Sequence, residues 1–180
     1  KRGEDTGERQ RERGGGEKED AQGWERDRHL EKVGGQSADT SEVFFDAVEI
    51  PPENILGGEP GRGFYQMMEQ LTQERLIIAC GAQGAMEGAV ERTTAYAQER
   101  QAFGGPIMQF QNTRFRLAEC LTKTQVARAF LDTCISEHLA GKLSVERAAM
   151  AKYWMTETQF EVLDACVQLH GGYGYMAEYD

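Results

Sequence analysis

The sequence lacks the marks of several large protein classes. No apolar run approaches the ~20 residues that span a bilayer, so no membrane span is expected. The net charge of −10 argues against a nucleic-acid surface, which needs clustered Lys and Arg. Neither GxGxxG, a Walker loop, GxSxG nor HExxH occurs. The function must therefore be inferred from residues that are spread along the sequence and not from one short motif.

Cysteine is scarce and is not paired in the sequence. The four thiols form no CxxC pair, so neither disulfides nor a metal site is expected, and a reducing compartment fits best. All four fall in helical patterns, where a free cysteine usually packs as a small buried apolar residue: Cys80, Cys120, Cys134 and Cys166.

Large apolar side chains are nearly absent from the amino-terminal part. Residues 1–22 are Gly-rich and mixed in charge, and we expect a disordered or aberrant segment, with a charged interaction tail as the alternative. They resemble neither a signal peptide nor a transit peptide, because an apolar stretch is missing and acidic residues interleave. Residues 40–50 mix β-branched and aromatic side chains before Pro51 and Pro52, which predicts a strand and then a turn.

Three long helical patterns follow and predict a mainly α fold. They run over residues 63–101, over 109–140, and from an N-cap at Ser144 to His170. Long helices joined by short loops indicate an antiparallel up-and-down bundle. Apolar residues at helical spacing predict the packed faces: Phe64, Met67, Leu71, Ile78, Ala82, Ala85 and Ala89; Leu117, Leu121, Phe130, Cys134, Ile135 and Leu139; and Val145, Ala149, Tyr153, Thr156, Phe160, Leu163, Val167 and His170.

Glu74 is the first candidate for chemistry. Its neighbours at helical spacing are aliphatic, namely Leu71, Ile77 and Ile78. A carboxylate that loses hydration among such side chains becomes a better proton acceptor. The alternative is a Glu that pairs with Arg75 or Gln70.

Two further patterns are candidates for ligand binding. Arg100, near the end of one helix, and Gln111, near the start of the next, can place a guanidinium and an amide at one helix corner, which suits an anionic phosphate. The alternative is an Arg that binds its own helix carbonyls. Gly171 and Gly172 permit close backbone approach to a ligand, although such glycines also end helices.

Together these patterns resemble the acyl-CoA dehydrogenase family. The resemblance covers about residues 23–179 and rests on DTSEVFFD at 39–46, GFY at 63–65, QERL at 73–76, RQAFG at 100–104, FQ at 110–111 and QLHGGYGYMAEY at 168–179. It implies that residues 23–52 end a middle β-domain. Residues 53–180 would then form a carboxy-terminal four-helix bundle that lacks its last helix.

The resemblance also implies a cofactor and partners. Family members bind FAD between the β-domain and the bundle, form homotetramers or dimers that share FAD sites, and pass electrons to an electron-transferring flavoprotein. They work in the mitochondrial matrix or the bacterial cytoplasm. The implied cofactor-binding residues are Arg100, Phe103, Gln111, Gln168, Leu169, His170, Gly171 and Gly172.

The implied reaction converts an acyl-CoA thioester to the trans-2-enoyl-CoA. Long-chain and isovaleryl members carry the base on the first long helix, at the position matched by Glu74, whereas short- and medium-chain members use a later loop. Glu74 therefore favours the long-chain or isovaleryl subclass. The implied substrate-binding residues are Tyr65, Thr72, Gln73, Glu74 and Arg75.

The chain departs from the family by lacking most of the β-domain and the final helix. We therefore expect the isolated chain to be inactive. Two alternatives stay open at this point: an acyl-CoA oxidase, whose reduced flavin reacts with oxygen, and a non-catalytic helical module that only associates with other subunits.

Overall fold

The computed structural model of the chain describes residues 23–35 and 37–179, so the segment 1–22 lies outside the described residues. The chain divides into two compact units, one that ends at Arg62 and one that begins at Gly63. Within the described ranges, no helix combines the length and the apolar character that crossing a membrane requires.

The first unit contains a short antiparallel hairpin. Strand β1 spans Trp24–His29 and strand β2 spans Ser41–Phe45. Their register pairs Trp24 with Phe45 and His29 with Ser41, with an irregularity between Arg26 and His29. The predicted strand is thus present, whereas β1, rich in charged residues, was not predicted.

Strand β2 is shorter than the predicted 40–50. The Asp46 N–H donates to the Gly23 carbonyl at 2.7 Å, which closes the pairing. Ala47 then adopts a φ of 49°, a conformation that is unfavourable for a side chain with a Cβ and that ends the extended backbone. A short 3₁₀ helix, η2 (Pro52–Asn54), follows where the prolines predicted a turn.

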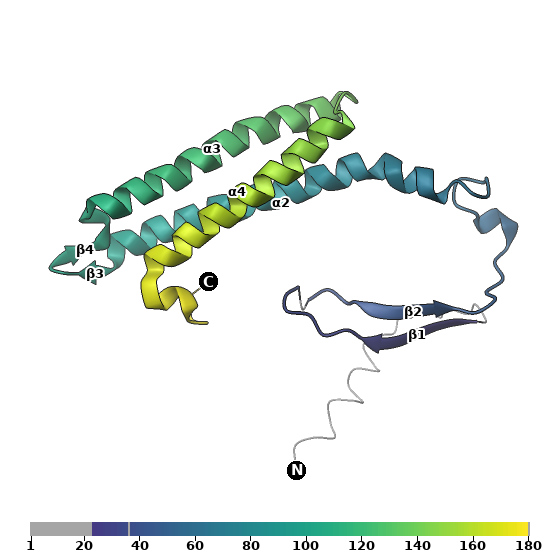
Figure 1. The fold of residues 1–180 in the computed structure, drawn as a ribbon, viewed down its shortest axis with the longest axis horizontal. Coiled ribbons are helices and arrows are strands. Elements are labelled where there is room, and N and C mark those ends of the chain that lie inside the picture. Colours follow the sequence, from purple (N-terminus) through teal and green to yellow (C-terminus); the bar gives the residue numbers. More distant parts are fainter. Residues whose placement is uncertain (1–22, 36, 180) are drawn as a thin grey trace, which may run out of the picture. The chain divides into compact units, whose positions relative to one another are not determined.

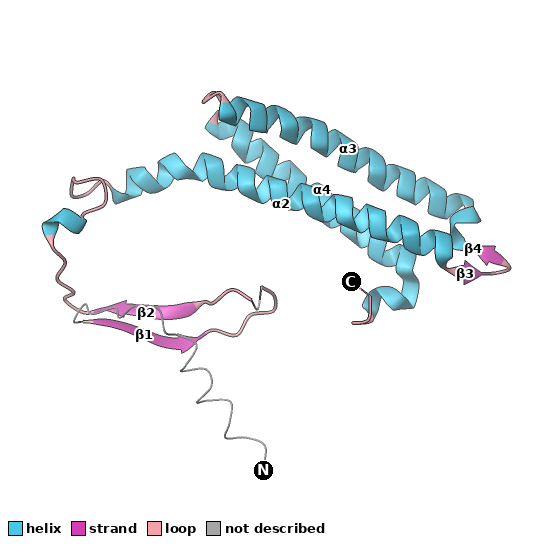
Figure 2. Ribbon diagram, turned by 180° about the vertical axis from the view of Figure 1, so that it is seen from behind, coloured by secondary structure: helices cyan, strands magenta, loops and turns pink. Residues whose placement is uncertain are grey.

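The second unit is an antiparallel bundle of three long helices (Figure 1). They are α2 (Gly63–Glu99), α3 (Gln111–Leu139) and α4 (Val145–His170), as the helical patterns predicted. The predicted cap of α4 is confirmed, because the Arg147 N–H donates to Ser144 Oγ at 3.2 Å. Figure 2 shows from behind that α2 and α4 cross closely while α3 runs alongside both.

Short elements connect the helices. Between α2 and α3 lie β3 (Gln101–Ala102), β4 (Gly105–Pro106) and the 3₁₀ helix η3 (Ile107–Gln109). The predicted first helix therefore ends at Glu99 and not at Gln101, and strand β3 lies between its end and the glycines at 104 and 105. After α4, the 3₁₀ helix η4 (Gly171–Tyr175) turns the chain back, beginning at a Gly171 with a φ of 60°.

The core is built from small residues, and this corrects the predicted face of the third helix. Of the eight predicted positions on α4, none is fully buried, and Tyr153 and Phe160 are 67% and 74% exposed. The buried face of α4 is Ala148, Ala151, Met155, Thr158, Val162 and Cys166. Small side chains on most of this face let α2 and α4 approach closely, and Tyr153 and Phe160 lie outside this contact.

The other predicted packing positions divide similarly. Ala82, Ala89, Leu117 and Cys134 are buried, whereas Phe64, Met67, Ile78, Leu121 and Leu139 are exposed. Among the cysteines, Cys120, Cys134 and Cys166 are buried as expected, but Cys80 is exposed on the outer face of α2. Hydrophobicity alone therefore identified the helices better than their inner faces.

A polar network joins α2 to α3. The Arg128 guanidinium donates to both oxygens of Glu87, with Nη2 at 2.8 Å from Oε1 and 2.7 Å from Oε2. The buried Gln83 Nε2 donates to Glu87 Oε1 at 2.9 Å and to the Thr124 carbonyl at 3.1 Å. Hydrogen bonds from Arg128, and then from Gln83, lower the pKa of Glu87 below its usual range.

We expect Glu87→Gln to destabilise the chain at neutral pH but not in acid. Because the pKa of Glu87 is lowered on folding, its contribution is present above the unfolded pKa and is lost as the pH falls through the folded pKa. The Arg128 and Glu87 side chains are 40% and 42% exposed, so solvent screening keeps the loss at about 0.5–1 kcal/mol. Urea unfolding at pH 7 and pH 3 measures it.

Glu91→Gln is the matched control, since Glu91 is an exposed carboxylate one turn further along α2. At pH 7, Glu91→Gln should lower the free energy of unfolding by less than Glu87→Gln does. If Glu87→Gln lowered the free energy of unfolding by the same amount at pH 7 and at pH 3, the assignment of this network would be contradicted.

Candidate functional site

A pocket lies where the end of α2 meets the end of α4. Its volume is about 340 Å³. It is lined by Tyr96, Arg100, His170, Gly171, Gly172, Tyr173 and Met176. The fold thus brings together four of the residues that the sequence nominated for cofactor binding, although seventy positions separate Arg100 from the others.

Stacked rings form one wall of this pocket. The Tyr96 and His170 rings are stacked with centroids 4.2 Å apart, and the Tyr96 hydroxyl donates to the His170 carbonyl at 3.3 Å. His170 Nδ1 lies 2.9 Å from the Cys166 carbonyl, which can only accept, so Nδ1 carries a proton. Burial raises the pKa of Tyr96, which keeps its hydroxyl neutral.

Arg100 supplies the charge of the pocket. Its guanidinium carbon lies 4.8 Å from the centre of the Tyr173 ring, a cation–π contact between two lining residues. No Asp or Glu side chain is among the lining residues. A cation beside aromatic rings fits a phosphate that is attached to an aromatic base.

The two glycines leave the backbone of this wall open. A Cβ built on Gly171 or Gly172 meets no atom within 4 Å, so the backbone here faces open space. A ligand can approach the main chain closely at such a position. The residues present therefore fit part of a dinucleotide such as FAD.

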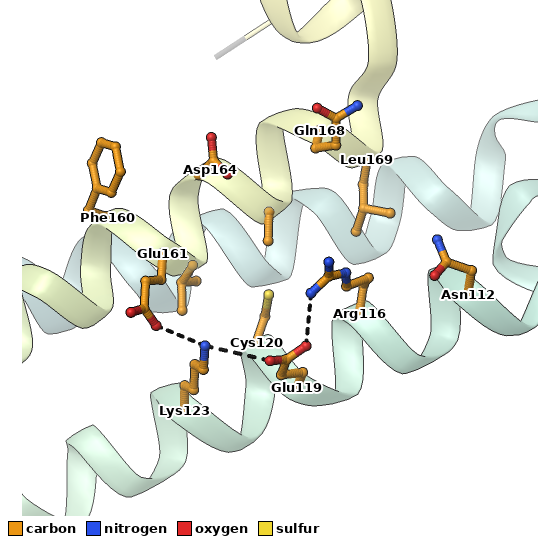
Figure 3. A pocket seen from close by; sticks show the side chains of 12 residues that line it. Asn112, Arg116, Glu119, Cys120, Lys123, Phe160, Glu161, Asp164, Gln168 and Leu169 are labelled. Carbon is orange, nitrogen blue, oxygen red and sulfur yellow. Dashed lines mark hydrogen bonds and ion pairs between the residues drawn. The ribbon is translucent and has the colours of Figure 1, made fainter.

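Gln168 and Leu169 lie elsewhere. They line a groove of about 560 Å³ between α3 and α4 (Figure 3). Figure 3 shows them on α4 across from Asn112 and Arg116 of α3. The nominated segment of residues 168–172 is thus split by the helix end, with its first two side chains in the groove and its last three residues at the pocket.

Phe103 and Gln111 occupy the corner between α2 and α3. Phe103 has a φ of 52° and is 96% exposed, and its ring lies edge-on to that of Phe110 at 6.1 Å. Both residues of the tight turn, Phe103 and Gly104, have positive φ, as a two-residue hairpin needs. A bulky residue held in this unfavourable conformation and presented to solvent is typical of a functional contact.

The amino-terminal end of α2 projects past the other helices (Figure 1). Glu74 lies in the first third of α2. The first buried residue of α2 is Leu76, so the preceding turns lie outside the core. Glu74 is exposed, and within the described residues its carboxylate has no side-chain hydrogen bond or ion pair, including with Arg75 or Gln70. The alternative interpretation, in which Glu74 pairs with Arg75 or Gln70, is therefore not supported.

Other nominated residues share this part of α2. Tyr65 and Gln73 are exposed, and Thr72 and Arg75 are half-buried. Ile77 and Ile78 lie one helical turn from Glu74 and are exposed. Several large apolar side chains along residues 64–78 of α2 are more than 40% exposed: Phe64, Tyr65, Met67, Met68, Ile77 and Ile78. This gives Glu74 the aliphatic surroundings that the sequence predicted, but on the surface of this chain.

Sequence reasoning did not single out Tyr96 or Met176 as site residues. Tyr96 precedes Arg100 by four residues, which places both on one helix face. This spacing was a usable signal for Tyr96. Met176 enters the pocket only because η4 turns the chain back, and no local pattern indicated that.

Comparison with known proteins identifies the family of the chain. Residues 61–180 match the family described as "Acyl-CoA dehydrogenase, C-terminal domain". The mitochondrial long-chain specific acyl-CoA dehydrogenase of Sus scrofa is 45% identical over 157 residues, and an acyl-CoA dehydrogenase of Bacillus subtilis is 36% identical over 148 residues. These alignments cover 87% and 82% of this chain.

A solved structure supports the same family. The acyl-CoA dehydrogenase of Geobacillus kaustophilus superposes with a TM-score of 0.84 at 47% identity, and the match covers 90% of this chain and 42% of that one. The sequence match and the fold thus define a helical domain of the acyl-CoA dehydrogenase type. The chain belongs to the acyl-CoA dehydrogenase family. It spans 36% of the length of its Sus scrofa relative and 39% of that from Bacillus subtilis.

Proposed function

We propose that this chain provides the helical part of an enzyme that oxidises acyl-CoA thioesters to trans-2-enoyl-CoA with FAD, and that Glu74 is the base. One observation carries the proposal. Glu74 presents an unpaired carboxylate from an apolar helix surface, at the position that the family resemblance assigns to the base.

The surroundings of Glu74 suit proton abstraction. Ile77 and Ile78 are 59% and 45% exposed, so a bound acyl chain or a further protein segment would cover aliphatic surface beside the carboxylate. Covering it removes water from Glu74 and makes the carboxylate a stronger proton acceptor. Glu74 then takes the proton from the α-carbon while a hydride leaves the β-carbon.

The cofactor would be FAD, which when bound supplies the acceptor for that hydride. Arg100 would hold a phosphate, and Tyr96, His170 and Tyr173 would offer ring faces to the adenine. Gln168, Leu169, Phe103 and Gln111 face other directions. We assign them to the remaining FAD contacts, including those offered to a neighbouring subunit of a dimer or tetramer.

The long-chain subclass is favoured over the other members. The family resemblance assigns Glu74 to the base position of that subclass, and the Sus scrofa relative of 45% identity is a long-chain enzyme. Tyr65, Thr72, Gln73 and Arg75 would line the substrate beside Glu74. An electron-transferring flavoprotein would accept the electrons, in the mitochondrial matrix or the bacterial cytoplasm.

The experiment grafts residues 61–180 into the long-chain enzyme of Sus scrofa in place of the matching segment. We expect the purified graft to retain flavin and to bleach it anaerobically on addition of a long-chain acyl-CoA. Arg100→Ala in this graft should weaken flavin retention about 10-fold or more, since it removes a charge-assisted hydrogen bond. Flavin absorbance after dialysis measures this.

Arg114→Ala is the matched control, because Arg114 is an exposed arginine early in α3 that does not line the pocket. It should leave the flavin content unchanged. A graft that holds flavin as the parent does but is not bleached by any acyl-CoA would overturn the proposed function. Hydrogen peroxide formed at the turnover rate in air would instead identify an oxidase.

A further inference from the structure

Helix α4 and the 3₁₀ helix η4 meet at a single residue. His170 is both the last residue of α4 and the N-cap of η4. Gly171 follows with a φ of 60° and a ψ of −135°, a combination that glycine adopts far more readily than a residue with a Cβ. We call residues 170–172 the α4–η4 joint. The conformation of this joint sets where the backbone of Gly171 and Gly172 lies.

Tyr96 of α2 contacts the joint through both its hydroxyl and its ring. The hydroxyl donates to the His170 carbonyl at 3.3 Å. The ring stacks on the His170 ring, with centroids 4.2 Å apart and planes at 20°. The same ring lies edge-on to that of Tyr179, with centroids 6.0 Å apart. One side chain of α2 thus contacts the last residue of α4 by backbone and ring, and also the chain beyond η4.

Other contacts to this region come from α4 itself. His170 Nδ1 donates to the Cys166 carbonyl at 2.9 Å, so its own helix fixes the ring that stacks on Tyr96. Gly174 packs on the last turn of α4, because a Cβ built on it would lie 2.6 Å from the Val167 carbonyl oxygen. These contacts place η4 against α4. The hydroxyl of Tyr96 ties the joint to α2, the helix that carries Arg100.

The relation between α2 and the joint matters for the pocket. Arg100 lies on α2, whereas Gly171 and Gly172 follow α4, and all three line the pocket of about 340 Å³. A ligand that contacts the guanidinium and the glycine backbone together needs both at a fixed separation, because affinity depends on groups that are already in place. Tyr96 is one helical turn before Arg100, so its hydroxyl couples the joint to the turn that carries the charge.

We propose that the Tyr96 hydroxyl is a positioning group for the cofactor, which acts through the His170 carbonyl and holds the backbone of Gly171 and Gly172 at the pocket opposite Arg100. This inference rests on the proposed function, in which the pocket takes part of FAD. Removal of the hydroxyl should loosen the joint and weaken FAD binding, although the ring and Arg100 remain.

Hydrogen exchange of the 180-residue chain tests the joint without any flavin. Tyr96→Phe keeps the ring and removes the hydroxyl. We expect the amides of residues 171–176 to exchange about 3- to 10-fold faster, the factor that corresponds to one neutral hydrogen bond. Two of these amides are hydrogen-bonded, that of Gly171 to the Gln168 carbonyl and that of Met176 to the Tyr173 carbonyl. Residues 151–162, in the middle of α4, should exchange at an unchanged rate.

Flavin titration of the Sus scrofa graft tests the link to the cofactor. Tyr96→Phe should raise the dissociation constant of FAD by about 3- to 10-fold. At saturating FAD, the KM for a long-chain acyl-CoA should keep its value, because its proposed contacts lie around Glu74. A general defect in folding would not separate the two ligands in this way.

Tyr153→Phe is the matched control, since Tyr153 is a 67% exposed tyrosine of α4 that does not line the pocket. It should change neither the exchange of residues 171–176 nor the affinity for FAD. Unchanged exchange in Tyr96→Phe would overturn the positioning role, and so would faster exchange with an unchanged FAD dissociation constant. An unsubstituted graft that holds no flavin would instead overturn the proposed function, whatever the exchange rates show.

Discussion

Replacing Glu74 by Gln should lower the rate of flavin reduction by about 10²- to 10⁴-fold, the range that removal of a general base produces. Gln keeps the size of the side chain and its hydrogen-bonding capacity but cannot accept the α proton. Glu74 is exposed and has no side-chain partner within the described residues, so the change removes no internal contact. Anaerobic single-turnover bleaching of the grafted enzyme by a long-chain acyl-CoA measures the rate.

Glu69→Gln is the control for this substitution. Glu69 is an exposed carboxylate on the same part of α2, five positions before Glu74 and therefore on a different helix face. We expect its rate to lie within about 2-fold of the unsubstituted graft, because an exposed surface change away from the reacting atoms has little effect. Flavin content and substrate affinity should be similar in both variants, so that only the chemical step differs. Near-full activity of Glu74→Gln would assign the base to a residue outside this chain.

The lengths of the helices could be predicted from the sequence because local chemistry sets them. Ser144 caps α4 through its hydroxyl, and a glycine at residue 171 ends the helix with positive φ. Such signals depend on a few neighbouring residues. The strand β1 gave no comparable signal, since WERDRH alternates charges rather than apolar residues and is held by pairing with β2.

The inward faces were harder to predict, because hydrophobicity does not say which partner a side chain contacts. Phe160 and Tyr153 are the larger apolar groups of α4, yet Ala148 and Ala151 form its contact with the bundle. Close packing of helices depends on small side chains at the crossing. Helix α4 therefore has two apolar faces, one with small buried side chains and one with large exposed side chains. The sequence pattern identified only the face with the large side chains.

The candidate site was predictable as residues but not as an arrangement. Arg100, His170 and Gly171 were nominated from separate patterns, and the pocket unites them. Gln168 was nominated with His170 as one segment, yet a helical residue two positions away points about 160° from it, and the two side chains lie in different cavities. The spacing of residues along a helix therefore indicates which side chains share a face, and a linear motif does not.

Replacing Leu131 by Ala should lower the free energy of unfolding by about 2–5 kcal/mol, the range for truncating a fully buried leucine. Leu131 is 1% exposed and lies in the core cluster. Most of its neighbours in that cluster are Ala and Cys, and the large fully buried apolar side chains are few: Met86, Leu131 and Met155. Each therefore fills much of the space between the helices. Urea unfolding followed by circular dichroism measures the loss.

Leu121→Ala makes the same chemical change on the same helix at a position that is 48% exposed. Its cost should stay below about 1 kcal/mol, because little apolar area returns to water and no cavity forms. The difference between the two variants isolates the cavity from the shared effect of Ala on helix propensity. Equal losses would contradict this packing, since the core would then not depend on which face of α3 meets α2 and α4. A larger loss for Leu121 would place the inward face of α3 where the hydrophobic pattern alone had put it.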